Sequence, residues 1–224
     1  MKVILHPVQK EILKNLVYKP NARFRDLNTT ELTNDQFTFH LKKLLGDGYI
    51  EKIEEGYKLT NQGLLYSSNL DLDSLEVPHI KVGVKLYIER KNGKETEVLL
   101  GERLRDPFKG TIGFHTHKVR ADESVFETAR RCLLNETGLT GDFEYAGLEY
   151  IIEKSEDALN SSRMMNFIRV KNIQGEMLEI TKESKNTWVN IKEISKLENT
   201  YHDILEDLSL FQRKEMFYSE KVRK

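Results

Sequence analysis

The chain has 224 residues, of which 38% are hydrophobic and 32% charged, a composition typical of soluble proteins. Its formal net charge is only −1, so any binding of nucleic acid would depend on a local basic patch. Cys132 is the only cysteine, which excludes an internal disulfide and a multi-cysteine zinc cluster. Because no apolar run is long enough to cross a membrane and the first residues do not resemble a signal peptide, we expect a cytoplasmic protein that does not bind membranes.

Residues 1–70 predict a succession of helices followed by a hairpin. Pro7 suits a first helical turn, and apolar residues follow it at helical spacing. A short second helix is expected over residues 23–27, where apolar side chains can reach the same core. Thr33 and Gln36 form a capping-box pattern at the start of a third helix, which is expected to end near a pair of glycines.

A hairpin and a short helix are expected to complete this first domain. Residues 49–53 and 57–60 are β-type runs that flank a glycine-containing turn, and residues 61–68 suit a helix. This order of elements resembles the winged helix-turn-helix domains of bacterial and archaeal regulators. The resemblance covers residues 1–70, makes residues 32–44 the recognition helix, and makes the hairpin the wing.

The resemblance to winged helices implies double-stranded DNA as a partner. The side chains that could reach phosphates or base edges are Gln36, Thr38, His40, Lys42, Lys43, Arg23 and Arg25. The alternative is a winged helix that binds protein, because the expected wing carries Glu51, Glu54 and Glu55 beside two lysines. A homodimer is expected, since paired winged helices read paired half-sites.

A second domain is expected to follow an acidic linker. Residues 71–78 end in a proline and break the helical pattern, so they are interpreted as the linker, and residues 79–218 as the domain. Its strands are expected at 79–90, 97–104, 143–153, 165–171 and 187–191, and its closing helix at 201–215. The last residues are expected to be a frayed basic tail, and the fold class is α+β.

Residues 113–139 carry the pattern that bears most directly on function. Ser124 and Glu127 make a capping box for a helix that ends near a glycine. The segment resembles the Nudix box, a loop, helix and loop that in that family binds Mg²⁺ and positions water against a diphosphate. The residues that match its pattern are Glu123, Arg131, Leu133, Glu136, Gly138 and Leu139. The resemblance implies a Nudix fold, an α/β/α sandwich with a mixed sheet.

The same segment departs from the positions that bind metal in the family. Thr116 and His117 replace the family's leading glycines, and Cys132 and Asn135 replace two of its three clustered glutamates. Glu136 alone remains of that trio. Because Mg²⁺ requires hard oxygen ligands, we expect an inactive or weakened hydrolase with no cofactor.

Alternative roles remain open for several residues of this segment. If the domain is active, Mg²⁺ or Mn²⁺ would be held by Glu136 and Glu123. The alternative for Glu123 and Glu127 is a structural role in helix capping and in an i,i+4 pair of Glu127 with Arg131. His115 and His117 would point the same way in an extended segment. One interpretation is that they face Cys132 and Glu136 and form a transition-metal site with them. The other is that they only replace flexible glycines of the loop. Cys132 is interpreted as a small buried hydrophobe rather than a nucleophile.

These patterns together predict a DNA-binding transcription regulator whose impaired Nudix-like domain senses a nucleotide or sugar nucleotide. It resembles Nudix-related regulators that sense ADP-ribose-like metabolites, although in those the winged helix follows the Nudix domain. Arg103, Arg105 and Lys118 could hold the effector's phosphates, or could be solvated surface charges. The alternatives are a divergent Nudix hydrolase that cleaves nucleoside diphosphate derivatives such as ADP-ribose with Mg²⁺, and a protein-interaction adaptor.

Overall fold

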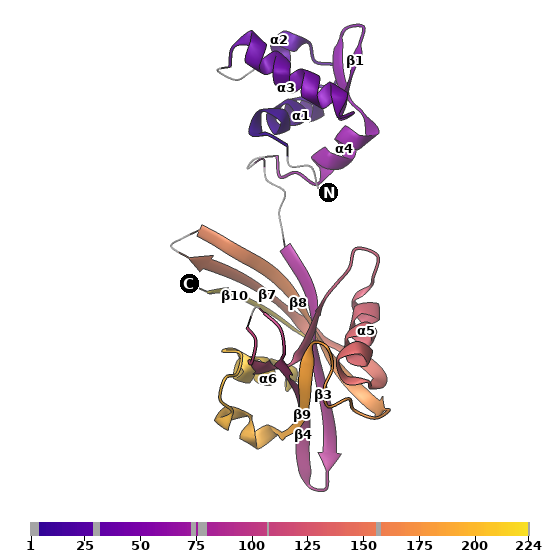
Figure 1. The fold of residues 1–224 in the computed structure, drawn as a ribbon, viewed down its shortest axis with the longest axis vertical. Helices are drawn as coiled ribbons and strands as arrows, with labels where there is room; N and C mark the ends of the chain where they lie inside the picture. The colour runs from indigo at the N-terminus through magenta and orange to yellow at the C-terminus, as the bar shows by residue number, and fades with distance from the viewer. Residues whose placement is uncertain are drawn as a thin grey trace. The chain divides into compact units, whose positions relative to one another are not determined.

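The structure is a computed structural model that describes residues 5–28, 32–72, 75, 80–106, 108–155 and 158–223. The chain divides into two compact units, Met1–Pro78 and His79–Lys224 (Figure 1). Most of the expected linker, residues 71–78, lies outside the described residues. Each unit is therefore considered by itself.

The N-terminal unit has the order of elements that the sequence predicts. These are α1 (Pro7–Tyr18), α2 (Phe24–Leu27), α3 (Asn34–Gly46), β1 (Ile50–Ile53), β2 (Gly56–Leu59) and α4 (Asn61–Ser68). β1 and β2 pair as an antiparallel hairpin. The Thr33 hydroxyl accepts the amide of Gln36, whose own side chain accepts the amide of Thr33, so the capping box that begins α3 is confirmed. Phe37, Leu41 and Leu44 of α3 are buried in the core of this unit.

The second unit is built on one mixed sheet. Its strands are β3 (Ile80–Asn92), β4 (Glu95–Arg103), β5 (Ile112–Gly113), β6 (His115–Lys118), β7 (Thr140–Ser155), β8 (Ala158–Gln174), β9 (Ser184–Asn190) and β10 (Phe217–Arg223). The strand order is β10-β7-β8-β3-β4-β5, with β6 paired to β3 and β9 paired to β4. β3 runs parallel to β8 and β10 parallel to β7, whereas the other pairs are antiparallel.

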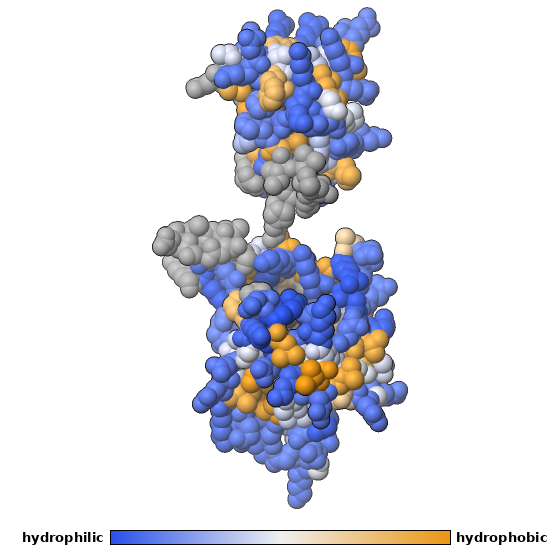
Figure 2. All heavy atoms as spheres, in the orientation of Figure 1, coloured by the Kyte–Doolittle hydropathy of each residue, from blue (hydrophilic) through white to orange (hydrophobic). Residues whose placement is uncertain are grey.

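Helices cover both faces of this sheet, as the α/β/α sandwich implied by the Nudix resemblance predicts (Figure 1). They are α5 (Val125–Thr137), the 3₁₀ helix η1 (Ile191–Lys196) and α6 (Ile204–Phe211). Alternate residues of β3 point to opposite faces: Val84 and Leu86 pack in the core under α5, whereas Tyr87 packs with Phe211 in the core under α6. Hydrophilic residues cover most of the visible surface (Figure 2). Among the described residues, no helix is long and apolar enough to cross a membrane.

The C-terminal segment corrects two of our predictions. Residues 217–223 form β10 rather than a frayed tail, so the sheet extends past residue 218, and the closing helix is α6, shorter than the predicted 201–215. β10 approaches β7 closely at Gly147, where a Cβ would lie 2.5 Å from the Phe217 carbonyl oxygen. A larger residue at position 147 would push the strand away from the sheet.

β10 also supplies cations to a group of buried acids under α6. Glu149 of β7 is fully buried, and its carboxylate lies 2.6 Å from the ammonium of Lys221. Lys221 also lies 2.8 Å from Glu206, and Arg223 pairs with buried Asp203 at 2.5 Å. A buried carboxylate without a cation is costly, so these contacts help to hold β10 in the sheet.

We predict that Lys221→Met lowers the free energy of unfolding by roughly 3 to 5 kcal/mol, because it leaves the Glu149 carboxylate buried without its cation. The measurement is urea unfolding at neutral pH. Lys192→Met is the control: Lys192 is exposed and lies 3.8 Å from Glu95, so its loss should cost less than about 1 kcal/mol.

The double variant Lys221→Met/Glu149→Leu separates the lost ion pair from lost packing. It should recover more than half of the stability that Lys221→Met loses, because no charge is then left buried. A single variant as stable as the Lys192 control, or a double variant no better than the single one, would contradict this account.

Candidate functional site

The Nudix-like segment forms a strand, a loop and a well-capped helix. The Ser124 hydroxyl accepts the amide of Glu127 and the Glu127 carboxylate accepts the amide of Ser124, so α5 begins with the predicted capping box. Gly138 follows α5 in the left-handed conformation, with a φ of 74°. One side of α5, including Ala129 and Leu133, packs on the sheet. This fixes where the remaining side chains of the helix can reach.

Glu123 and Arg131 form a two-pronged ion pair at the start of α5. The Nε and Nη2 atoms of Arg131 lie 2.7 and 2.6 Å from the two carboxylate oxygens of Glu123. Hydrogen bonds from Arg131 are the main cause that lowers the pKa of Glu123 to about 2. Glu127, in turn, is held in the cap. Both glutamates therefore have structural roles, but Arg131 pairs with Glu123 rather than with Glu127, the residue at i,i+4 spacing for which the pair was expected.

His117 of β6 connects Arg131 to Glu136. Its Nδ1 lies 2.8 Å from Nη1 of Arg131, and its Nε2 lies 2.7 Å from Oε1 of Glu136. A guanidinium can only donate hydrogen bonds, so Nδ1 of His117 must accept. The proton of a neutral imidazole then resides on Nε2 and is donated to Glu136.

The second oxygen of Glu136 is also engaged. The Ser184 hydroxyl of β9 lies 3.1 Å from Oε2 of Glu136, and the Asn186 amide donates to the backbone carbonyl of Glu136 at 2.6 Å. Glu136 is only 6% exposed. Burial opposes its ionisation, but the hydrogen bonds from His117 and Ser184 oppose burial, and the pKa of Glu136 is below its usual value. Glu136 is thus an ionised carboxylate with a hydrogen-bond donor on each oxygen.

His115 and Cys132 lie beside this network and are buried. Burial lowers the pKa of His115 to about 4, so the imidazole is neutral at physiological pH. Its ring lies against β4, where a Cβ on Gly101 would be 2.7 Å from Cε1 of His115. Burial raises the pKa of the Cys132 thiol well above its usual value, with the charge of Glu136 adding to the effect. Neither group is suited to nucleophilic chemistry in this state.

The possible metal site at His115, His117, Cys132 and Glu136 is not assembled here. Among the residues described, the one group of at least three such side chains with ligand atoms all within 4.8 Å of one another is Glu149, Asp203 and Asp207. That group lies under α6 and already contacts Lys85, Lys221 and Arg223. Those cations leave the three carboxylates little need of a metal ion.

The other predicted site residues are scattered around the domain. Asn135 is exposed on α5, next to Glu136 in the chain. Arg105 pairs with Glu183, and Nε of Arg103 donates to the Arg105 carbonyl, both at the end of β4. Lys118 lies at the end of β6, where β6 pairs with β3. Arg103 is thus the last residue of β4, Arg105 lies just beyond it, and Lys118 is the last residue of β6.

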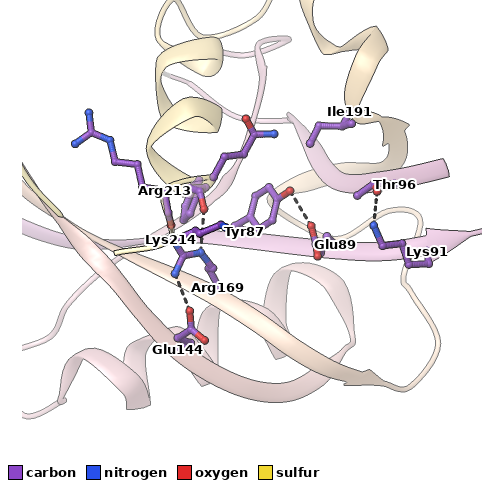
Figure 3. Close-up of a pocket in the computed structure, with 11 residues that line it drawn as sticks. Tyr87, Glu89, Lys91, Thr96, Glu144, Arg169, Ile191, Arg213 and Lys214 are labelled. Atoms are coloured by element: carbon purple, nitrogen blue, oxygen red, sulfur yellow. Dashed lines mark hydrogen bonds and ion pairs between the residues drawn. The ribbon is translucent and has the colours of Figure 1, made fainter. Parts of the chain in front are cut away.

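A hollow of about 510 Å³ lies on the opposite face of the sheet, near the end of α6 (Figure 3). Sequence reasoning did not identify it. Its floor holds Arg169, which donates to the backbone carbonyl of Phe211 at 2.9 Å and to Glu144 at 2.7 Å. Tyr87 lines one wall and donates to Glu89 at 2.9 Å. Arg169 thus serves to anchor the end of α6.

The predicted DNA-contacting residues differ in how available they are. Arg23, Arg25, Lys42 and Lys43 are exposed, although Lys43 pairs with Asp47 at 3.3 Å. The Gln36 oxygen is engaged in the helix cap, and Thr38 is half-buried. The His40 ring stacks on His6 with centroids 4.4 Å apart. Phe39, which we did not single out, is 65% exposed on α3.

The buried thiol gives a direct test of the packing around the box. Because Cys132 is fully buried with a raised pKa, we predict that native protein reacts with DTNB roughly 100-fold or more slowly than urea-unfolded protein. Cys132→Ser should show no reaction in either state, since the chain has no other cysteine. Immediate stoichiometric reaction of the native protein would show that α5 does not pack as described.

Comparison with known proteins supports the fold of the second unit. The mutator MutT protein of Bacillus halodurans matches with a TM-score of 0.54 and 22% identity, over 64% of this chain and 90% of that one. The NUDIX domain of Shewanella oneidensis NrtR, solved in complex with ADP ribose, matches with a TM-score of 0.52 and 17% identity, over 68% of this chain and 96% of that one. No curated protein matches this chain.

The family model described as NUDIX domain matches residues 79–208. This range contains β3 to β9, α5 and most of α6, and it includes the network around Glu136. The resemblance that residues 113–139 carry is thereby confirmed at the level of the family. The chain belongs to the Nudix family.

Proposed function

We propose that this protein is a cytoplasmic DNA-binding transcription regulator whose Nudix domain binds a nucleotide-type effector and does not hydrolyse it. The observation that carries the proposal is the engagement of Glu136. Its carboxylate, the only one left of the family's trio, is hydrogen-bonded to His117 and Ser184 and is 6% exposed. In a hydrolase of this family, this carboxylate would face a metal ion.

Metal binding at this degenerate box would require several unfavourable changes. An ion would have to replace the proton that His117 donates to Glu136 and would leave Arg131 facing an additional positive charge. The neighbouring position 132 offers a buried thiol and position 135 an amide, so few hard oxygen ligands are available for Mg²⁺. Without the ion, little remains to stabilise charge on a scissile diphosphate.

The N-terminal unit is proposed to be a winged helix that binds double-stranded DNA. Its helices precede a short antiparallel hairpin, the order that led to the winged-helix interpretation. In this interpretation α3 is the recognition helix, and Lys42 and Lys43 on its exposed side contact phosphates. On the hairpin, Lys58 pairs with Glu51 at 3.0 Å, which reduces the wing's net positive charge. A homodimer would present paired helices to paired half-sites.

The class of effector is proposed by analogy within the family. The NUDIX domain of Shewanella oneidensis NrtR has a similar fold and was solved with ADP ribose. A ligand of this kind would alter DNA affinity only if it bound one arrangement of the two units better than another. The rival function is a divergent Nudix hydrolase that cleaves ADP-ribose or a related compound with Mg²⁺ or Mn²⁺.

Restoration of the box distinguishes these functions. We predict that His117→Gly/Cys132→Glu/Asn135→Glu raises the affinity for Mg²⁺ by at least about tenfold over the wild type, because it adds two carboxylates and frees Glu136. Isothermal titration calorimetry measures the affinity. Adding Glu136→Gln to this variant should remove most of the gain.

The same proteins are incubated with ADP-ribose and with nucleoside triphosphates in Mg²⁺ or Mn²⁺. The wild type should give no product above the level of its Glu136→Gln variant. Turnover by the wild type that Glu136→Gln abolishes would refute the regulator proposal and favour the hydrolase.

Binding of DNA is tested with a duplex library of random sequence. We predict saturable binding whose log–log salt slope falls by about one for each of Lys42→Ala and Lys43→Ala. Lys94→Ala, an exposed lysine in the β3–β4 turn, is the matched control and should change nothing. Added ADP-ribose should shift the apparent affinity of the full chain. A chain that binds no duplex at physiological salt would refute DNA binding.

A further inference from the structure

An aromatic residue stands at the centre of the solvent-facing side of α3. Phe37, Leu41 and Leu44 bury the opposite side of this helix. Phe39 points away from them and is 65% exposed. A benzyl side chain in this position gains little burial from folding, so most of its apolar surface is available to another molecule.

The neighbours of Phe39 on this face suit an anionic partner. Lys42 and Lys43 follow at spacings of three and four residues, which places them on the same side of the helix, and both are exposed. Gly46 lies a further turn along, with nothing within 4 Å of the position that a Cβ would occupy. Asp35 lies before Phe39 on this face, and Asp47, just beyond α3, pairs with Lys43 at 3.3 Å, so the cationic stretch is the one that holds Lys42 and Lys43.

The ring of Phe39 packs against a second aromatic ring of the same unit. It meets the His40 ring edge to face, with centroids 5.4 Å apart and an interplanar angle of 79°. His40 in turn stacks on His6, at 4.4 Å and 22°, and His6 caps the start of α1. Burial, with the nearby His6, lowers the pKa of His40, which favours an uncharged stack. A ring that is already braced loses less conformational freedom when it binds.

We infer that Phe39 reads thymine, by placing its ring against the C5 methyl group of that base in the major groove of DNA. This inference rests on the proposed function. Phenylalanine cannot form the hydrogen bonds that distinguish other base edges, and the thymine methyl is the apolar group that the major groove presents. Lys42 and Lys43 on the same face would hold the flanking phosphates. Because Gly46 has no side chain, the end of the helix could approach the groove closely.

The test removes only the methyl group. A duplex site is selected from the random library by the wild-type chain and resynthesised with deoxyuridine in place of thymidine at each position in turn. At one or more positions, the wild type should bind the uridine duplex about fourfold more weakly, the effect of one methyl-sized apolar contact. Phe39→Ala should bind the thymidine and uridine duplexes equally well at these positions.

Matched variants separate a specific contact from general weakening. Tyr18→Ala removes another exposed aromatic of the same unit and should keep the wild-type preference for thymidine. Lys42→Ala should weaken binding to both duplexes by the same factor. Circular dichroism of each variant checks that α3 remains folded.

The outcomes distinguish this inference from the proposed function. If a site is selected but no uridine substitution weakens the wild type, or if Phe39→Ala keeps the same preference, the thymine contact is refuted and DNA binding stands. If the chain selects no site and binds no duplex, both are refuted. A self-association that Phe39→Ala disrupts, without any effect on DNA, would assign this face to a second copy of the chain instead.

Discussion

A buried, ionised carboxylate on α5 has to be stabilised by its surroundings, and at Glu136 this requirement ties α5 to β6 and β9. In this protein the carboxylate accepts hydrogen bonds from a histidine on β6 and a serine on β9, and the histidine in turn accepts from the guanidinium of Arg131. The chain of hydrogen bonds continues to Glu123 and so reaches the start of the helix. A Nudix domain that binds Mg²⁺ would meet the same requirement with an ion, which is mobile and exchangeable. Here it is met by side chains that are fixed to the sheet.

The alternation of β3 separates this network from the other polar region of the domain. Residues such as Val84 and Leu86 face α5, whereas Lys85 faces α6 and pairs with Asp207 at 2.5 Å. Burial raises the pKa of Asp207 to about 6, although the nearby Lys85 opposes this shift. The cluster under α6 therefore contains both cations and acids, and it joins β3, β7, α6 and β10. Its role in the structure is to attach elements to one another, on the face opposite to the box.

The sequence predicted the elements whose signals are local. The capping boxes at Thr33 and Ser124 marked where α3 and α5 begin, because the hydrogen bonds of a cap lie within one helical turn. β7 and β8 are longer than predicted because bulges interrupt their alternation of apolar and polar residues. β10 was missed since its inward residues include Lys221 and Arg223, which resemble a solvated tail until their buried partners are known. The sequence placed His117 toward Glu136 only as one of two alternatives, and as a metal ligand rather than a hydrogen-bond donor. Ser184 belongs to no motif, so its contact with Glu136 could not be predicted.

The place of β10 in the chain has a consequence for synthesis. Glu149 belongs to a strand in the middle of the chain, but Lys221 belongs to the last element of the domain described here. During translation the acid is made first and its cation some seventy residues later, roughly several seconds at ordinary rates of elongation. Until then the β7 edge lacks its neighbouring strand, and a nascent domain in this condition exposes a site at which chaperones or other strands can pair.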